Sequence, residues 1–138
     1  MAADYILGID YGDERVGLAI MQCIARLPHP FKTIPNNHNL VSTLVETVRA
    51  EQVGLVVVGV PRNMDGSESD QSERCRMFAA SLRDNLTVVV EEVDETLSSV
   101  EAEQRLQQTK KPYKKADIDA EAAAIMLERY AGEYGGKV

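Results

Sequence analysis

The sequence predicts an α/β fold, a mixed five-stranded sheet flanked by helices, from the order and spacing of its apolar segments. Three short apolar segments come first, and the two that follow alternate with helical patterns. The first two are joined by a short turn, which favours antiparallel pairing, whereas strands separated by a helix pair in parallel. A length of 138 residues fits one domain, which we place at 1–138.

The first half of the chain contains four of the predicted strands. Residues 5–9 form an apolar run that ends at Asp10, and residues 16–21 follow after a short turn. Residues 31–34 lie between two prolines, so we expect a weaker strand at or near the sheet edge. A helix capped by Asn39 then leads to residues 53–60, a valine-rich run typical of a parallel strand buried on both faces.

The second half contains the remaining helices and the fifth strand. We expect a helix at 70–82, a strand at 86–90, and two helices at about 98–108 and 117–130. The inward positions of the first of these helices are Cys75, Phe78, Ala79 and Leu82.

Three acids stand out because each lies where a strand ends or a helix begins. Asp10 ends the first strand, Glu95 follows the fifth strand beside Asp94, and Asp119 lies in the first turn of the last helix. The positions that share a helical face with Asp119 are Ala122, Ala123 and Met126. We therefore expect Asp119 to face the sheet, with small alanines allowing a close approach to the first strand.

Helix capping is the alternative role for the acids at the start of the last helix, because the first turn of a helix favours negative charge. For Asp117 we prefer capping. For Asp119, position alone supports capping and catalysis equally.

A cluster of carboxylates limits the chemistry of the site. Two carboxylates ~4 Å apart repel each other by roughly 4 kcal/mol at an effective dielectric constant of 20, so such a cluster binds protons or cations. Mg²⁺ and Mn²⁺ prefer oxygen ligands, and two such ions can activate water and stabilise the leaving oxygen of a phosphodiester. His29 and His38 lie in predicted loops, where we expect solvated side chains and no partner for a nucleophilic serine or cysteine.

Four ordered motifs carry a resemblance to a known family. The chain contains IDYG at 9–12 with RVGLA at 15–19, then VGVPRNMDGS at 58–67, DETLSSVEA at 94–102 and DAEAAAIML at 119–127. These segments resemble the successive motifs of the YqgF family, bacterial proteins described as Holliday-junction resolvases or as nucleases that mature the 5′ end of pre-16S ribosomal RNA. The resemblance covers nearly the whole chain.

The resemblance implies an RNase H-like fold and a metal-dependent endonuclease. It places the catalytic and metal-binding acids at Asp10, Glu95 and Asp119, with Mg²⁺ or Mn²⁺ as the cofactor. The chain departs from the family at Thr96, where the family usually has arginine. If that arginine contacts phosphate, this chain lacks one charge-assisted contact with its substrate.

Two segments are candidates for contact with nucleic acid. A net charge of −7 argues against nonspecific coating of DNA or RNA, so the local distribution of charge matters more. The most basic stretch contains Lys110, Lys111, Lys114 and Lys115, and its alternative role is a solvated connection. The loop after the fourth strand offers Arg62 and Asn63, although it also serves as a strand-to-helix turn.

Two other functions compete with a nuclease. Actin-like ATPases and sugar kinases also have a strand, an Asp-x-Gly turn and a second strand, but they close two domains over ATP. The second alternative is a nucleic-acid or ribosome-binding module that keeps the fold without cleaving. The sequence leaves open whether the substrate is precursor RNA or junction DNA, whether the protein associates with ribosomes, and whether it forms a homodimer.

The N-terminal residues and the cysteines favour a cytoplasmic protein. The first residues contain an acid and lack a basic segment followed by a long apolar run, which argues against a signal peptide or membrane span. Cys23 and Cys75 have neither metal-ligand spacing nor a disulfide pattern, so we expect reduced thiols.

Overall fold

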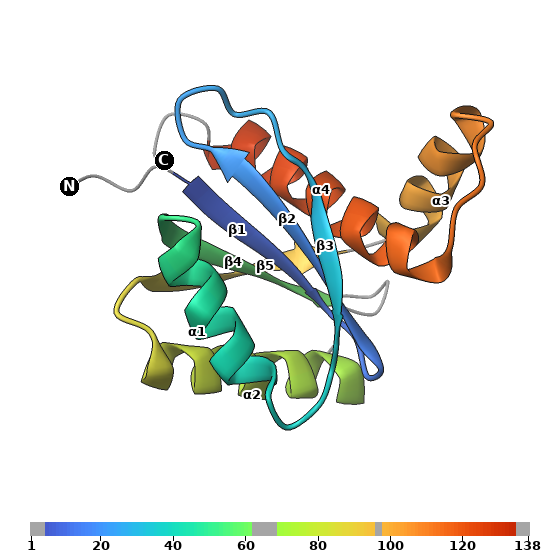
Figure 1. Cartoon of the computed structure of the whole chain (residues 1–138). Helices are drawn as coiled ribbons and strands as arrows, with labels where there is room; N and C mark the ends of the chain where they lie inside the picture. Colours follow the sequence, from blue (N-terminus) through green and yellow to red (C-terminus); the bar gives the residue numbers. More distant parts are fainter. Residues whose placement is uncertain (1–4, 62–68, 96–97, 135–138) are drawn as a thin grey trace.

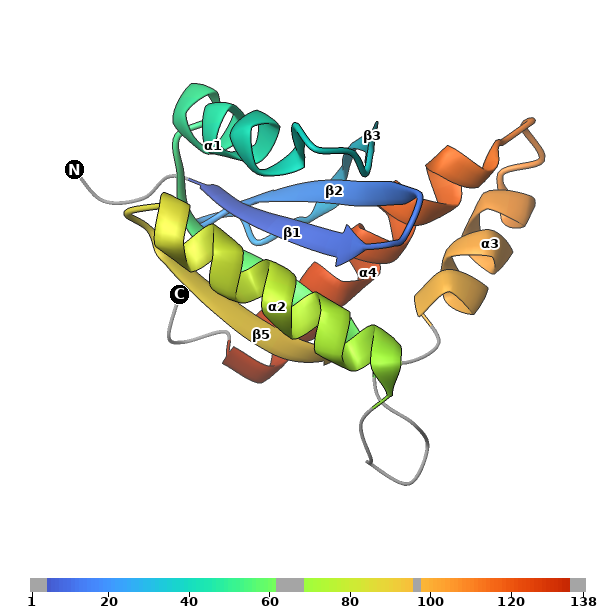
Figure 2. The same ribbon diagram turned by 90° about the horizontal axis from the view of Figure 1, so that it is seen from below.

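Helices cover both faces of a five-stranded mixed sheet in the computed structural model, which describes residues 5–61, 69–95 and 98–134 (Figures 1 and 2). The strands are β1 (Tyr5–Tyr11), β2 (Arg15–Gln22), β3 (His29–Pro35), β4 (Val53–Pro61) and β5 (Val89–Glu95). The helices are α1 (Leu40–Ala50), α2 (Asp70–Asn85), α3 (Ser98–Gln108) and α4 (Lys115–Tyr134). This confirms the predicted fold class.

The order of the strands across the sheet is β3-β2-β1-β4-β5. The pairs β1–β2 and β2–β3 are antiparallel, whereas β1–β4 and β4–β5 are parallel, as the connections predict. The short strand β3, which contains Pro30 and Pro35, lies at the edge as expected. The carboxyl ends of β1, β4 and β5 therefore lie at the same end of the sheet.

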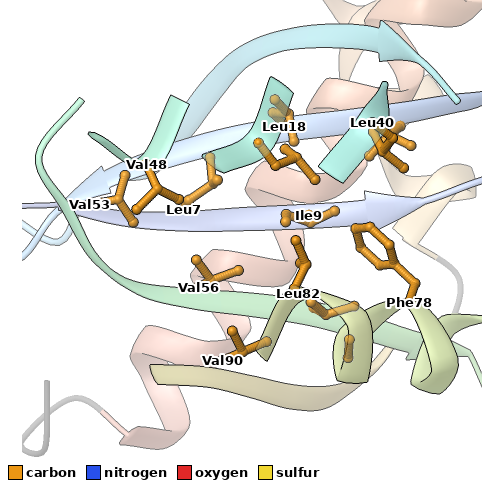
Figure 3. Packing of buried hydrophobic residues seen from close by; sticks show 14 residues of the cluster. Leu7, Ile9, Leu18, Leu40, Val48, Val53, Val56, Phe78, Leu82 and Val90 are labelled. Carbon is orange, nitrogen blue, oxygen red and sulfur yellow. The ribbon is translucent and has the colours of Figure 1, made fainter. Parts of the chain in front are cut away.

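The two faces of the sheet have separate cores. Leu7 and Ile9 of β1 pack with α1 and α2, in the cluster that Figure 3 shows between these helices and the sheet. Ile6 packs with α4 on the opposite face. A Cβ atom added to Gly8 would lie 2.6 Å from Cγ of Leu127, so α4 comes close to β1 there. Side chains alternate along a strand, so Asp10 belongs to the face of α4.

The fifth strand differs from the prediction. It covers Val89–Glu95 instead of 86–90, so Asp94 and Glu95 end the strand and do not follow it. The predicted strand ended before the charged residues Glu91 and Glu92, but in the sheet each of these carboxylates has a polar partner. The hydroxyl of Tyr130 donates to Oε2 of Glu91 at 2.8 Å, and Arg83 forms an ion pair with Glu92 at 3.0 Å.

Smaller features agree with the predictions in part. Asn39 is the N-cap residue of α1, but its side chain makes no capping hydrogen bond. The four inward positions of α2 are buried. Cys23 and Cys75 are not joined in a disulfide. Within the described ranges, none of the helices combines the length and the apolar character that crossing a membrane requires.

Candidate active site

The site starts from Asp10, near the carboxyl end of β1. Asp10 pairs with Gly17 of the antiparallel strand β2. Residues that pair directly in this way have their side chains on the same face of the sheet. A side chain at position 17 would therefore point to the same face of the sheet as the side chain of Asp10. The Asp10 side chain is half-buried.

Gly17 is the place where α4 touches the sheet. A Cβ atom added there would lie 2.1 Å from the backbone oxygen of Asp119 and 2.8 Å from the nitrogen of Ala120. Such distances exclude any side chain, so only glycine lets the helix backbone rest on β2 at this point. Because Asp10 pairs with Gly17, the close approach brings the backbone of Asp119 near the strand position of Asp10.

Arg15 holds the carboxylate of Asp119. Its Nε atom donates to Oδ2 of Asp119 at 2.6 Å, and the Asp119 side chain is 22% exposed. The hydrogen bond to Asp119, with its negative charge, raises the pKa of Arg15 above the usual value. Arg15 is two residues before Gly17 on β2, so both belong to the face that α4 covers.

The structure separates the roles of the two acids at the start of α4. The backbone N–H of Lys114 donates to Oδ2 of Asp117 at 2.8 Å, which confirms that Asp117 caps the helix. This bond also explains why α4 begins at Lys115, two residues earlier than predicted. The prediction that Asp119 lies in the first turn is wrong, since Asp119 lies in the second turn and its carboxylate contacts Arg15.

A second contact fixes the start of α4 on the sheet. The hydroxyl of Thr33 in β3 donates to the backbone oxygen of Ala116 at 2.5 Å. Together with the contact at Gly17, this bond attaches the first two turns of the helix to β3 and β2. The position of Asp119 is therefore set by the backbone as well as by Arg15.

The register of β5 distinguishes Asp94 from Glu95. Asp94 belongs to the same alternating series as Val90 and Glu92, which face α2, and it is exposed. Position 95 belongs to the other series, with Glu91 and Val93, which face α4. The side chain of Glu95 lies outside the described residues. Within the described side chains, no three histidine, cysteine or carboxylate groups gather closely enough to hold a metal ion.

The predicted nucleic-acid contacts lie partly outside the described residues. Arg62, Asn63 and Thr96 all fall there. The four lysines are described and exposed: Lys110, Lys111 and Lys114 lie in the α3–α4 connection, and Lys115 is the first residue of α4. They surround the start of α4, the helix that carries Asp119.

Sequence reasoning missed Gly17 and Arg15 as parts of the site. Both lie in the RVGLA motif, which was quoted for the resemblance without a role for either residue. A glycine in the middle of an apolar strand is itself a signal, because it often marks the close approach of another backbone. The alanines of α4 predicted that the helix approaches the sheet closely, but they did not identify the residue of the sheet that the helix contacts.

Comparison with known proteins agrees with the motifs. The RuvX family, described as "Holliday junction resolvase", matches residues 4–132. A protein of Chloroflexus aurantiacus (strain ATCC 29366 / DSM 635 / J-10-fl) named "Putative pre-16S rRNA nuclease" is 42% identical over 130 residues, covering 91% of this chain and 84% of the relative. A protein of Maridesulfovibrio salexigens with the same name is 35% identical over 129 residues, covering 91% of this chain and 96% of the relative.

Solved structures share the fold at low sequence identity. RuvC from T. thermophilus, in complex with a Holliday junction substrate, has a TM-score of 0.62 at 12% identity, with 96% of both chains covered. The fowlpox virus resolvase, in a complex with Holliday junction DNA, has a TM-score of 0.56 at 14% identity, with 96% of this chain and 99% of the resolvase covered. The fold is therefore RNase H-like. From its motifs and its match over residues 4–132, this chain belongs to the RuvX family, which is the YqgF family that the motifs resemble.

Proposed function

We propose that this protein is a metal-dependent endonuclease that hydrolyses phosphodiester bonds in structured nucleic acid, at the 5′ end of pre-16S rRNA or in Holliday junctions. The observation that carries the proposal is the contact of the α4 backbone at Asp119 with Gly17, the residue of β2 that pairs with Asp10. The family and the names of the relatives support a nuclease. The description of the family names Holliday junctions, and the names of the relatives mention pre-16S rRNA, so the experiment must compare these two substrates.

The donor set fits a hard divalent cation. Asp10 and Asp119 offer carboxylate oxygens on one face, and the register of β5 supports Glu95 as the third. Mg²⁺ or Mn²⁺ bound there would activate a water molecule and stabilise the leaving oxygen. Asp119 would hold the metal with a carboxylate that Arg15 already orients through Oδ2.

The other residues would position the groups that react. Arg15 orients Asp119, as partners of metal-binding carboxylates commonly do. The lysines of the α3–α4 connection, with Arg62 and Asn63, would bind phosphates on either side of the acids. These roles require no nucleophilic side chain.

Cleavage assays test the proposal directly. Labelled pre-16S rRNA and a labelled four-way DNA junction are incubated side by side with Mg²⁺, Mn²⁺ or EDTA. We expect cleavage of at least one substrate with metal and none with EDTA. Binding of both substrates without cleavage under any condition would instead support the non-catalytic binding module. The actin-like ATPase alternative gains no support from the family, and ATP binding would be the observation in its favour.

Substitutions at the end of β5 test which acid belongs to the site. Glu95→Gln is expected to abolish cleavage, whereas Asp94→Asn should retain it, because only one of two consecutive residues in a strand can face Asp10. Both changes remove one charge with little change of shape, so each is the control for the other. Cleavage by Glu95→Gln together with an inactive Asp94→Asn would reverse the assignment.

Arg15 gives a test that does not depend on cleavage. Arg15→Met should weaken the binding of Mn²⁺ by about 10- to 100-fold, because outer partners of metal ligands typically contribute that much. Arg15→Lys should recover part of the loss, since lysine restores the charge but not the Nε geometry. Affinity is measured by titrating Mn²⁺ and following the melting temperature. Unchanged Mn²⁺ affinity in Arg15→Met would show that the ion pair only stabilises the helix.

A further inference from the structure

A hollow of about 440 Å³ lies between the edge strand β3 and the turn that joins α3 to α4. Phe31 and Lys32 line it from β3, and Lys111 and Tyr113 line it from the turn. Figures 1 and 2 show α3 and this turn standing off the sheet, away from α1 and α2. The space is therefore bounded by segments that are far apart in the sequence.

The two segments that border the hollow carry five of the six lysines in the sequence: Lys32, Lys110, Lys111, Lys114 and Lys115. All five are exposed. In a chain with a net charge of −7, this is a local concentration of positive charge. It would attract an anion to the hollow at a distance and would bind phosphates on contact.

Aromatic rings form part of the lining. The register of β2 and β3 shifts by one residue between Leu18 and Ala19, which leaves Phe31 outside the paired positions. The hydroxyl of Tyr113 donates to Glu103 at 3.1 Å and accepts from Gln107 at 3.3 Å, so α3 holds the tyrosine ring in place. Ordered rings beside lysines are what unpaired bases and their phosphates require.

Two acids, Asp117 and Glu121, line the hollow, and the carboxylate of each has a partner in the protein. The carboxylate of Asp117 accepts the backbone N–H of Lys114 at 2.8 Å. The carboxylate of Glu121 lies 3.8 Å from the guanidinium of Arg105, which offsets part of its negative charge. The two acids therefore oppose a bound phosphate less than carboxylates without such partners would.

The hollow lies beside the proposed catalytic acids. Asp117, Ala120 and Glu121 of α4 line it, and Asp119 lies in the same turns of that helix. A strand bound in the hollow would therefore be within about a helix diameter, ~10 Å, of the Asp119 carboxylate.

We infer that this hollow binds an unpaired nucleotide of the substrate, with its base against Phe31 and Tyr113 and its phosphates on Lys32 and Lys111. The inference rests on the proposed nuclease function and adds the substrate class, a strand that is single-stranded next to the cleaved bond. A fully paired duplex cannot offer its bases to the hollow without unpairing.

Binding measured without metal separates this inference from catalysis. Fluorescence anisotropy with a labelled oligo(dT) strand and a labelled blunt duplex of equal length is recorded in EDTA, where the proposed cleavage is absent. We expect the strand to bind more tightly than the duplex. Phe31→Leu should weaken strand binding by about fivefold or more and leave the duplex unchanged, because leucine keeps the apolar volume but lacks the ring face. Tyr113→Leu removes the second ring independently.

The lysines are tested by salt dependence. Replacing both Lys32 and Lys111 with alanine should weaken strand binding and reduce the slope of log affinity against log salt by about 1.4, as expected for two lost phosphate contacts. Arg49→Ala is the matched control, since Arg49 is an exposed cation at the end of α1, and it should bind as wild type does.

Three outcomes would overturn the inference: equal affinity for strand and duplex, wild-type binding by both leucine variants, or an unchanged salt slope in the double variant. Melting temperatures show whether each variant is folded. A protein that binds strands as expected but cleaves no substrate would contradict the proposed function and not this inference.

Discussion

Asp10→Asn is expected to abolish cleavage while the protein keeps its fold. Asparagine has nearly the shape of aspartate, so β1 and its pairing with Gly17 should be retained. The amide carries no charge and is a poorer ligand for a hard cation than a carboxylate. In the absence of metal, removing one charge from neighbouring carboxylates should leave the free energy of unfolding unchanged or raise it. Cleavage assays and thermal melts in EDTA measure the two effects.

The control for Asp10→Asn is the same change at an exposed acid far from the site. Asp84 lies in the last turn of α2, and Asp84→Asn should cleave as wild type does. If Asp10→Asn cleaves at nearly the wild-type rate, Asp10 has no part in the mechanism. If it unfolds, Asp10 has a structural role that the charge argument does not include.

Mn²⁺ or Mg²⁺ is expected to raise the melting temperature of the wild type, and Asp119→Asn should lose most of this effect. A ligand that binds only the folded state at a hundredfold excess over its Kd stabilises that state by about 2.7 kcal/mol. For a chain of this length, this corresponds to a rise of roughly 9 °C. The unfolded chain does not hold the acids together, so it competes weakly for the metal.

The same experiment distinguishes a metal ligand from a purely structural partner of Arg15. An ion pair that only stabilises the fold would leave the metal-induced shift unchanged in Asp119→Asn. Asp117→Asn is the matched control, because Asp117 makes the capping bond at Lys114. It should show the full metal shift. A full shift in Asp119→Asn would limit the carboxylate site to Asp10 and Glu95.

The elements that the sequence predicted well are those whose pattern depends on local chemistry. The valine run of β4, the prolines around β3 and the inward positions of α2 all follow from residues close together in the chain. The motifs also identified the RuvX family correctly. Each of these patterns is contained in a short stretch of the sequence.

The features that were missed depend on contacts between distant residues. The predicted fifth strand ended too early because the partners that allow Glu91 and Glu92 to lie in the sheet come from α4 and α2. The role of Gly17 appears only when α4 is placed against it, 102 positions before Asp119 in the chain. The ion pair of Arg15 with Asp119 likewise forms only when β2 and α4 are brought together. The three-acid site itself stays a prediction, since the Glu95 side chain is outside the described residues.

The prolines of β3 restrict how two copies of this protein could associate. A symmetric enzyme that cuts two strands of a junction needs two active sites related by a twofold axis. The simplest route, joining two sheets along their edges, requires backbone N–H donors, and Pro30 and Pro35 supply none. Two antiparallel β3 strands would also bring the Lys32 side chains of both copies near each other. A twofold pair formed through helices or through the β5 side would avoid this edge, and it would leave the hollow beside β3 open to nucleic acid in both copies.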